Sequence, residues 1–128
     1  MTSRQNNLMA LAALSGLIAV AAGAFGAHAI TDPKAQDWLK TGAHYQLVHA
    51  VAALVALSLT RAGLERVQTV ASLFLGGGLI FAGTLYAMAL GAPRILGAVT
   101  PLGGLGLMAG WSLLAWQAYR AGLGKAKP

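Results

Sequence analysis

The chain has 128 residues, of which 57 % are hydrophobic and only 9 % are charged, against about 25 % charged residues in an ordinary soluble domain. Its net charge of +6 does not indicate nucleic-acid binding, because the basic residues flank long apolar segments, where Lys and Arg meet lipid phosphates. The absence of cysteine excludes disulfides, thiolate catalysis and iron–sulfur clusters, and the three acidic residues all lie between the apolar segments.

Four uncharged segments make up most of the chain, at 5–31, 41–60, 67–93 and 95–119. A helix of about 20 apolar residues crosses the hydrocarbon core of a bilayer, which is about 30 Å thick. The sequence therefore predicts an all-α integral membrane four-helix bundle that forms a single domain over 1–128. Its spans are predicted at 8–30, 43–60, 67–90 and 101–119.

The first apolar segment could also be read as a secretory signal, because Arg4 precedes it and Ala27-His28-Ala29 matches a small-x-small cleavage site. The apolar stretch is longer than the roughly 15 residues that bound a typical signal core. We therefore interpret it as a retained span. Within it, Ala19, Gly23 and Ala27 are spaced four residues apart, which predicts a row of small residues for close helix packing.

The second span is preceded by a helix start signal, in which Asp32 is placed to cap the helix and Pro33 to occupy its first position. The stretch 34–42 is predicted to lie at the membrane interface, where Trp38 is a typical residue. A tight polar turn at 61–66 leads to the third span.

The fourth span is predicted to begin at Pro101, after a short apolar stretch at 95–100 that lies in the interface. Gly106 and Gly110 form a GxxxG spacing, which allows two helix backbones to approach closely. We favour packing within the bundle as the role of these glycines, with a homo-oligomer face as the alternative.

The orientation follows from the basic residues. With four spans, both termini and the 61–66 connection share one side. That side has six of the nine basic residues and the other has three, Lys34, Lys40 and Arg94. The positive-inside rule therefore predicts cytoplasmic N- and C-termini. The six are Arg4, Arg61, Arg66, Arg120, Lys125 and Lys127.

Polar side chains within spans cost free energy and need a partner or a function. Because successive spans alternate in direction, most of them are predicted at one membrane face, opposite the termini. Helix phase places Tyr45, Gln46 and His49 on one stripe of the second span. We expect His28, Gln46, His49 and Tyr86 to converge there. The candidate ligand-binding residues are His28, Tyr45, Gln46, His49, Thr84 and Tyr86.

Two interpretations of these residues remain open. They can form interhelical hydrogen bonds that fix the bundle, or they can line a pocket for a lipid headgroup, a quinone-like molecule or a small polar solute. His28 and His49 offer too few ligands for zinc and a poor setting for haem, so no metal or cofactor is predicted. No catalytic residue is predicted either.

Several segments together resemble one family. They are Gly23-Ala24-Phe25-Gly26-Ala27-His28, Tyr45-Gln46-x-x-His49, Phe81-Ala82-Gly83-Thr84-Leu85-Tyr86, Thr100-Pro101-Leu102-Gly103-Gly104 and Gly110-Trp111. This pattern is similar to that of the small bacterial inner-membrane proteins of domain-of-unknown-function family 423, to which the eukaryotic transmembrane protein 256 is related. Thr84 stands where the family often has Ser, which keeps the hydroxyl. The resemblance implies four spans and a location in the inner membrane, and it implies no activity.

The sequence thus favours a non-enzymatic membrane protein that serves as an accessory protein or binds a lipid or a partner. Its expected partners are membrane lipid and either further copies of itself or a larger membrane complex, without nucleic acid. The alternative is a minimal oligomeric transporter or channel for a small solute.

Overall fold

The computed structural model describes residues 2–126, and side chains as far as residue 124. The chain forms four long helices: α1 (Ser3–His28), α2 (Pro33–Ser58), α3 (Val67–Ala89) and α4 (Thr100–Ala126). Two short 3-10 helices, η1 (Leu59–Ala62) and η2 (Arg94–Ala98), lie in the connections. All four long helices are apolar and long enough to cross a membrane. The predicted all-α four-span bundle is confirmed.

The helix ends follow the local chemistry of the sequence. Thr2 and Gln5 form a reciprocal capping box at the start of α1. Asp32 accepts a hydrogen bond from the Ala35 backbone N–H, and Pro33 occupies the first position of α2, as expected. The helix therefore includes the interfacial stretch before the predicted second span.

Of the basic residues counted for orientation, Lys127 lies outside the described residues, and only the backbone of Lys125 is described.

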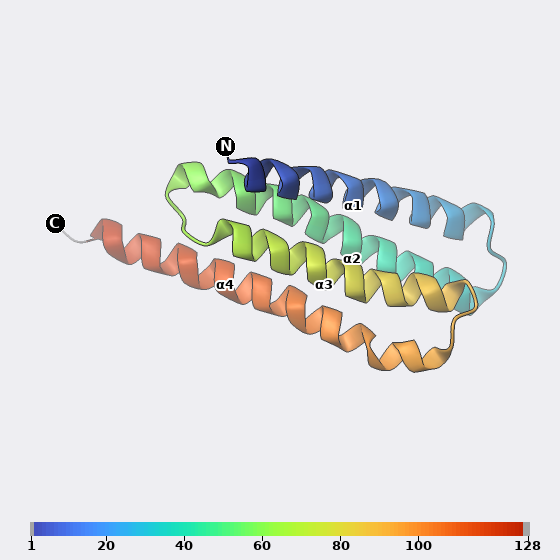
Figure 1. Cartoon of the computed structure of the whole chain (residues 1–128). Helices are drawn as coiled ribbons and strands as arrows, with labels where there is room; N and C mark the ends of the chain where they lie inside the picture. The colour runs from blue at the N-terminus through green and yellow to red at the C-terminus, as the bar shows by residue number, and fades with distance from the viewer. Residues whose placement is uncertain (1, 127–128) are drawn as a thin grey trace.

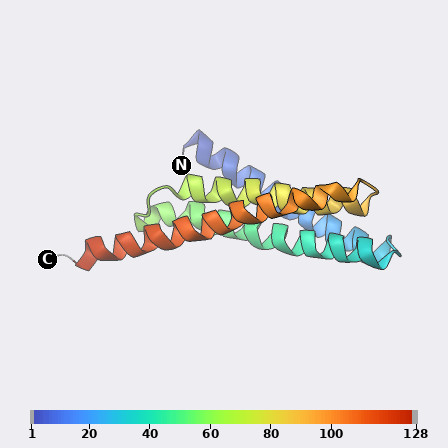
Figure 2. The same ribbon diagram turned by 90° about the horizontal axis from the view of Figure 1, so that it is seen from below.

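The helices pack mainly in chain order: α1 on α2, α2 on α3, and α3 on α4, with a shorter contact between α1 and α3. Figure 1 shows them side by side in this order, with α1 and α4 at opposite edges of the molecule, and Figure 2 shows α1 crossing behind the other helices. The bundle is therefore open, with α1 and α4 as its outer helices. Only 11 % of the apolar window of α1 is buried within the protein, against 44 % in α2 and α3.

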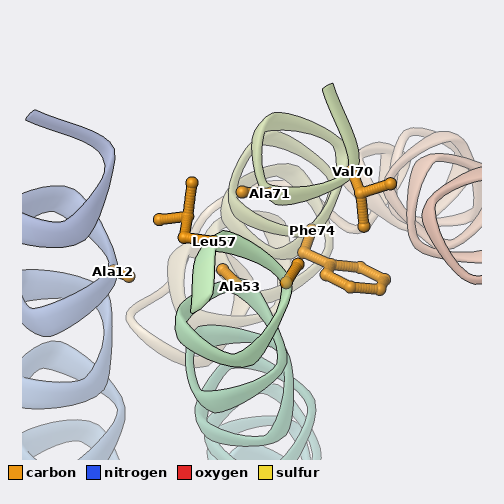
Figure 3. Close-up of a cluster of buried hydrophobic side chains, with 7 residues drawn as sticks. Ala12, Ala53, Leu57, Val70, Ala71 and Phe74 are labelled. Atoms are coloured by element: carbon orange, nitrogen blue, oxygen red, sulfur yellow. The ribbon is translucent and has the colours of Figure 1, made fainter. Parts of the chain in front are cut away.

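The apolar core lies toward the end of the molecule that contains the N-terminus of α1. Phe74, Leu57 and Val70 are its largest fully buried side chains. They pack with alanines of three helices, including Ala12 of α1 (Figure 3). Alanines on the neighbouring helices let α1 and α3 approach α2 closely, so this small core fixes one end of the bundle.

Small residues also form the seam between α1 and α2, although not in the predicted register. Ala12, Ala19 and Gly26 are buried at intervals of seven residues, and Gly23 faces Ala43. Ala27, which was predicted to belong to the packing row with Ala19 and Gly23, is exposed. Two packed helices follow a seven-residue repeat rather than a row at spacing four, because an α-helix has 3.6 residues per turn.

The seam between α3 and α4 brings two backbones into direct contact. A Cβ atom added at Gly77 would lie 2.8 Å from the Gly103 carbonyl oxygen. One added at Gly106 would lie 3.2 Å from the Gly77 Cα, and one at Gly110 would lie 2.7 Å from the Phe74 ring. The GxxxG glycines of α4 thus pack within the bundle.

Candidate functional site

Gln46 is at the centre of a hydrogen-bonded triad that joins three helices. Its Nε2 donates to the Ser15 hydroxyl of α1 at 3.1 Å, and the Tyr86 hydroxyl of α3 donates to its Oε1 at 2.7 Å. Gln46 is only 3 % exposed. Both ends of the buried amide are therefore satisfied, which offsets the cost of placing it inside a membrane protein.

Tyr86 reaches Gln46 because of its direction and because a glycine leaves space for it. Side chains on a helix point toward its N-terminus, so the ring of Tyr86 extends from the end of α3 back toward the middle of the bundle. It passes over Gly42, one turn before Gln46, where an added Cβ would lie only 2.7 Å from the Tyr86 Cε1. The sequence analysis missed this role of Gly42, although its spacing of four from Gln46 was a usable signal.

The triad lies deeper than the outer-face position that the sequence predicts. Gln46 is close to halfway along α2, and Ser15 is close to halfway along α1. The reason is that α2 begins at Pro33, well before residue 43, where the apolar span was placed. Residues 34–42, which were predicted to lie at the interface, are part of the continuous helix and make α2 longer than the predicted span.

His49, also on α2, contacts α4 rather than α1. Its Nδ1 is 2.7 Å from the Tyr45 carbonyl oxygen, and the Trp111 indole Nε1 donates to its Nε2 at 2.9 Å. A carbonyl only accepts and an indole only donates, so His49 is a neutral imidazole with its hydrogen on Nδ1. Both ring nitrogens are thus engaged within the protein. Trp111, which the sequence analysis noted only as part of a motif, completes this contact.

The remaining candidates are distributed over the bundle. The Tyr45 ring packs on Phe81 at 4.7 Å between centroids. Thr84 pairs with Thr100 at 2.6 Å and so joins α3 to the start of α4. His28 is exposed in the last turn of α1, and it takes part in none of the hydrogen bonds or ring contacts of the described residues. The structure brings Gln46 and Tyr86 together, directs His49 to α4, and leaves His28 apart.

These polar groups act chemically as links between helices. Within residues 2–124, no buried side-chain nitrogen or oxygen lacks a hydrogen-bond partner. An interhelical hydrogen bond in a membrane is worth about 0.6–2 kcal/mol. The arrangement therefore supports the structural interpretation of the Gln46 and His49 contacts.

A long groove runs between α1 and α3 over α2. Its first section, of about 450 Å³, has apolar walls of α1 and α3 and has Ser15 and Gln46 at its base. A second section, of about 320 Å³, includes Phe25, Tyr86 and Leu90 and adjoins the first at Ile18. The remaining wall residues of the first section are Leu8, Leu11, Leu14, Ser72, Leu75, Gly76 and Leu79.

The groove exists because α1 and α3 both pack on α2 while they touch each other only over a short stretch. Side chains of all three helices meet beneath it in the Gln46 triad, as they also do in the apolar core. The triad and the core together hold α1 and α3 on α2, and so they determine the width of the groove.

Comparisons with known proteins agree with this architecture. The family model described as protein of unknown function (DUF423) matches residues 22–104. A UPF0382 membrane protein of Haemophilus influenzae is 39 % identical, and the match covers 91 % of this chain and 97 % of that protein. The UPF0382 inner membrane protein YgdD of Escherichia coli K12 is also 39 % identical, over 94 % of this chain and 93 % of its own length. The relative YwdK of Bacillus subtilis is 36 % identical, over 86 % and 94 % respectively.

No solved structure shows a significant match to the chain. The matches to the family model and to the relatives extend over most of the sequence, and the four apolar helices are those of a multi-pass membrane protein. The chain belongs to the DUF423 (UPF0382) family, and it is a four-span protein of the bacterial inner membrane.

Proposed function

We propose that this protein is a non-enzymatic membrane protein that holds the acyl chain of a membrane lipid in the groove between α1 and α3. The observation that carries the proposal is the groove itself, which has apolar walls and a base whose polar groups are hydrogen-bonded to one another.

The dimensions of the groove fit this occupant. From Leu8 to Phe25 it extends about 25 Å along α1, at 1.5 Å per residue, which is close to the thickness of the hydrocarbon core. In the membrane, the molecules beside these residues are lipid chains, so the groove takes its occupant from its own surroundings. Ser15 and Gln46 are bonded within the protein, which favours plain hydrocarbon over a polar ligand.

The same contacts support a non-enzymatic role. His49, the buried histidine, has both ring nitrogens engaged by the backbone and by Trp111. Tyr86 donates its hydroxyl hydrogen to Gln46. A transporter needs polar groups that are available to a solute, whereas these groups pair with one another across helices.

The test uses two glycines of α3 whose added Cβ atoms would meet nothing within 4 Å. Gly76 lines the first section of the groove, and Gly83 lines neither section. Leu at Gly76 fills the groove, while Leu at Gly83 adds the same volume elsewhere. Native mass spectrometry of the gently extracted protein should show retained phospholipid in the wild type and in Gly83→Leu, and loss of most of it in Gly76→Leu.

Equal retention of lipid in Gly76→Leu and Gly83→Leu would contradict the proposal. A wild-type protein that retains a second copy or another protein in place of lipid would also contradict it, because the groove would then be a protein interface. Circular dichroism and the Tm of both variants establish that each remains folded.

We also propose that both termini and the connection between α2 and α3 face the cytoplasm, from the distribution of basic residues. In this cysteine-free chain, Ala62→Cys and Thr31→Cys place exposed thiols on the two sides. An impermeant thiol reagent outside intact cells or spheroplasts should label position 31 only. Labelling at position 62 and not at 31 means the opposite orientation.

A further inference from the structure

A second cavity, of about 570 Å³, lies at the outer end of the seam between α1 and α2. On α1 it is lined by Gly23, Gly26 and Ala27, which have no side chain beyond a Cβ. Long polar side chains of α2 therefore face open space. None of its lining residues lines the groove between α1 and α3, so the two are separate sites.

Two opposite charges line this cavity. Asp37 and Lys40 are three residues apart on α2, which places them on the same face of the helix. Both side chains are exposed, and they lie in the first two turns of α2, next to the last turns of α1. This is the level of the membrane interface, where the headgroups of lipids lie.

We propose that this cavity binds a phospholipid headgroup that carries both a phosphate and a primary ammonium, as phosphoethanolamine does. The Lys40 ammonium is the partner for the phosphate, and the Asp37 carboxylate is the partner for the lipid ammonium. Hydrogen bonds between ionised groups are about twice as strong as those between neutral groups. The cavity therefore presents one complementary charge for each charge of the headgroup.

The lining residues discriminate against other common headgroups. A quaternary trimethylammonium group has no N–H to donate to a carboxylate, and proteins recognise it with aromatic side chains. The residues that line the cavity are Gly23, Gly26, Ala27, Gln36, Asp37, Lys40 and Ala43, with no aromatic residue among them. A headgroup with phosphate as its only charge leaves Asp37 without a partner. The chemistry therefore selects a primary ammonium.

Gln36 helps to fix the shape of the cavity. Its side-chain amide donates a hydrogen bond to the Ile30 carbonyl oxygen, in the connection between α1 and α2. This bond ties the connection to the first turn of α2 and holds the two helix ends at a fixed separation. A preformed cavity binds its ligand at a lower cost in conformational entropy.

This inference goes beyond the acyl-chain binding proposed above, because it depends on a different site and a different set of residues, so each proposal can fail alone. The experiment is native mass spectrometry of the full chain in detergent with equal amounts of phosphatidylethanolamine, phosphatidylcholine and phosphatidylglycerol. The wild type should retain phosphatidylethanolamine about tenfold more than phosphatidylcholine, the effect of one charge-assisted hydrogen bond.

Asp37→Asn should abolish this preference, and Lys40→Gln should weaken retention of phosphatidylethanolamine. Lys34→Gln is the matched control, because it removes an exposed cation of the same helix that does not line the cavity. Gly76→Leu should reduce total lipid and leave the headgroup preference unchanged, which separates this site from the groove.

Three results would overturn the inference: equal retention of the three lipids by the wild type, a preserved preference in Asp37→Asn, or equal effects of Lys34→Gln and Lys40→Gln. The last result would mean that surface charge, rather than the cavity, attracts the lipid.

Discussion

The seam between α1 and α2 and the seam between α3 and α4 are both built from small residues, yet their backbones approach to different degrees. At the α1–α2 seam, an added Cβ at Gly16 would lie 4.0 Å from the Ala50 Cβ, and one at Gly23 would lie 3.6 Å from the Ala43 Cβ. These are ordinary contacts, whereas one added at Gly26 would lie 2.9 Å from the Leu39 Cβ, a tight contact with a side chain rather than with main-chain atoms. At the α3–α4 seam, an added Cβ at Gly103 would overlap the Phe81 backbone nitrogen.

The difference shows that glycine has two separate roles in this protein. Between α3 and α4, it is required, because main-chain atoms occupy the place of a side chain. Between α1 and α2, an added Cβ meets side chains only, so alanine fits at Gly16 and Gly23, whereas at Gly26 the Leu39 side chain would have to shift. Close backbone approach holds α4 against α3, whereas α1 packs on α2 through small side chains and through the Ser15–Gln46 hydrogen bond.

Gly103→Ala should have the largest effect. The added methyl group would overlap the α3 backbone, and a helix must move as a unit to relieve the overlap. We expect a loss of about 3 kcal/mol or more in the free energy of unfolding, at or above the upper end for overpacked cores. Reversible unfolding in mixed detergent micelles measures it. A variant with wild-type stability would contradict direct contact between the α3 and α4 backbones.

Gln46→Leu should have the next largest effect, because it leaves both Ser15 and the Tyr86 hydroxyl without a partner. We expect a loss of about 2–3 kcal/mol, and about 1 kcal/mol for Tyr86→Phe, which removes one bond. A double-mutant cycle on the two positions should give a coupling energy near the cost of the Tyr86 change alone. Additive effects would mean that the two side chains do not interact.

His49→Leu should cost about 1–2 kcal/mol, since it removes the Trp111 hydrogen bond and an aromatic contact with Phe74 while the glycine seam still holds α4. Trp111→Phe is the companion variant, because it removes the donor and keeps a ring. The indole fluorescence of Trp111 should shift in His49→Leu. The same shift in a Trp111→Phe background, which retains the other two tryptophans, would contradict the contact.

Gly16→Ala should have the smallest effect and the opposite sign. The methyl group meets Ala50 at an ordinary distance, and alanine favours helix by up to about 1 kcal/mol over glycine. The Tm in detergent should remain unchanged or rise slightly. A marked fall in the Tm would show that the α1–α2 seam is as tight as the α3–α4 seam.

The sequence predicts the class of fold from span length, and Asp32 with Pro33 and Pro101 are local signals for the starts of α2 and α4. It places the first span at residue 8, whereas α1 begins at Ser3 with the capping box of Thr2 and Gln5. It does not predict which small residues of α1 pack on α2, since spacings of three, four and seven all occur among the many small residues of that helix. Nor does it predict which polar residues meet. Gln46 and His49 lie on one stripe of α2, yet Gln46 bonds to α3 and His49 bonds to α4. Which helix each residue contacts depends on how the four helices are arranged around α2.

The groove and the cavity could not be predicted for the same reason. The groove arises because α1 and α3 contact each other over only a short stretch, and the cavity arises because α1 presents only small residues opposite polar side chains of α2. Both depend on how the whole bundle packs.

The most direct test of lipid binding between α1 and α3 is a photocrosslinking map. A phospholipid with a photoreactive group on its acyl chain is added at a low ratio to the detergent-solubilised protein, and the modified residues are located by peptide mass spectrometry. The account predicts modification concentrated at Leu75 and Leu79 of the groove, and little at Leu105 and Met108, which α4 exposes on its outer face. Equal modification of these two pairs would contradict it.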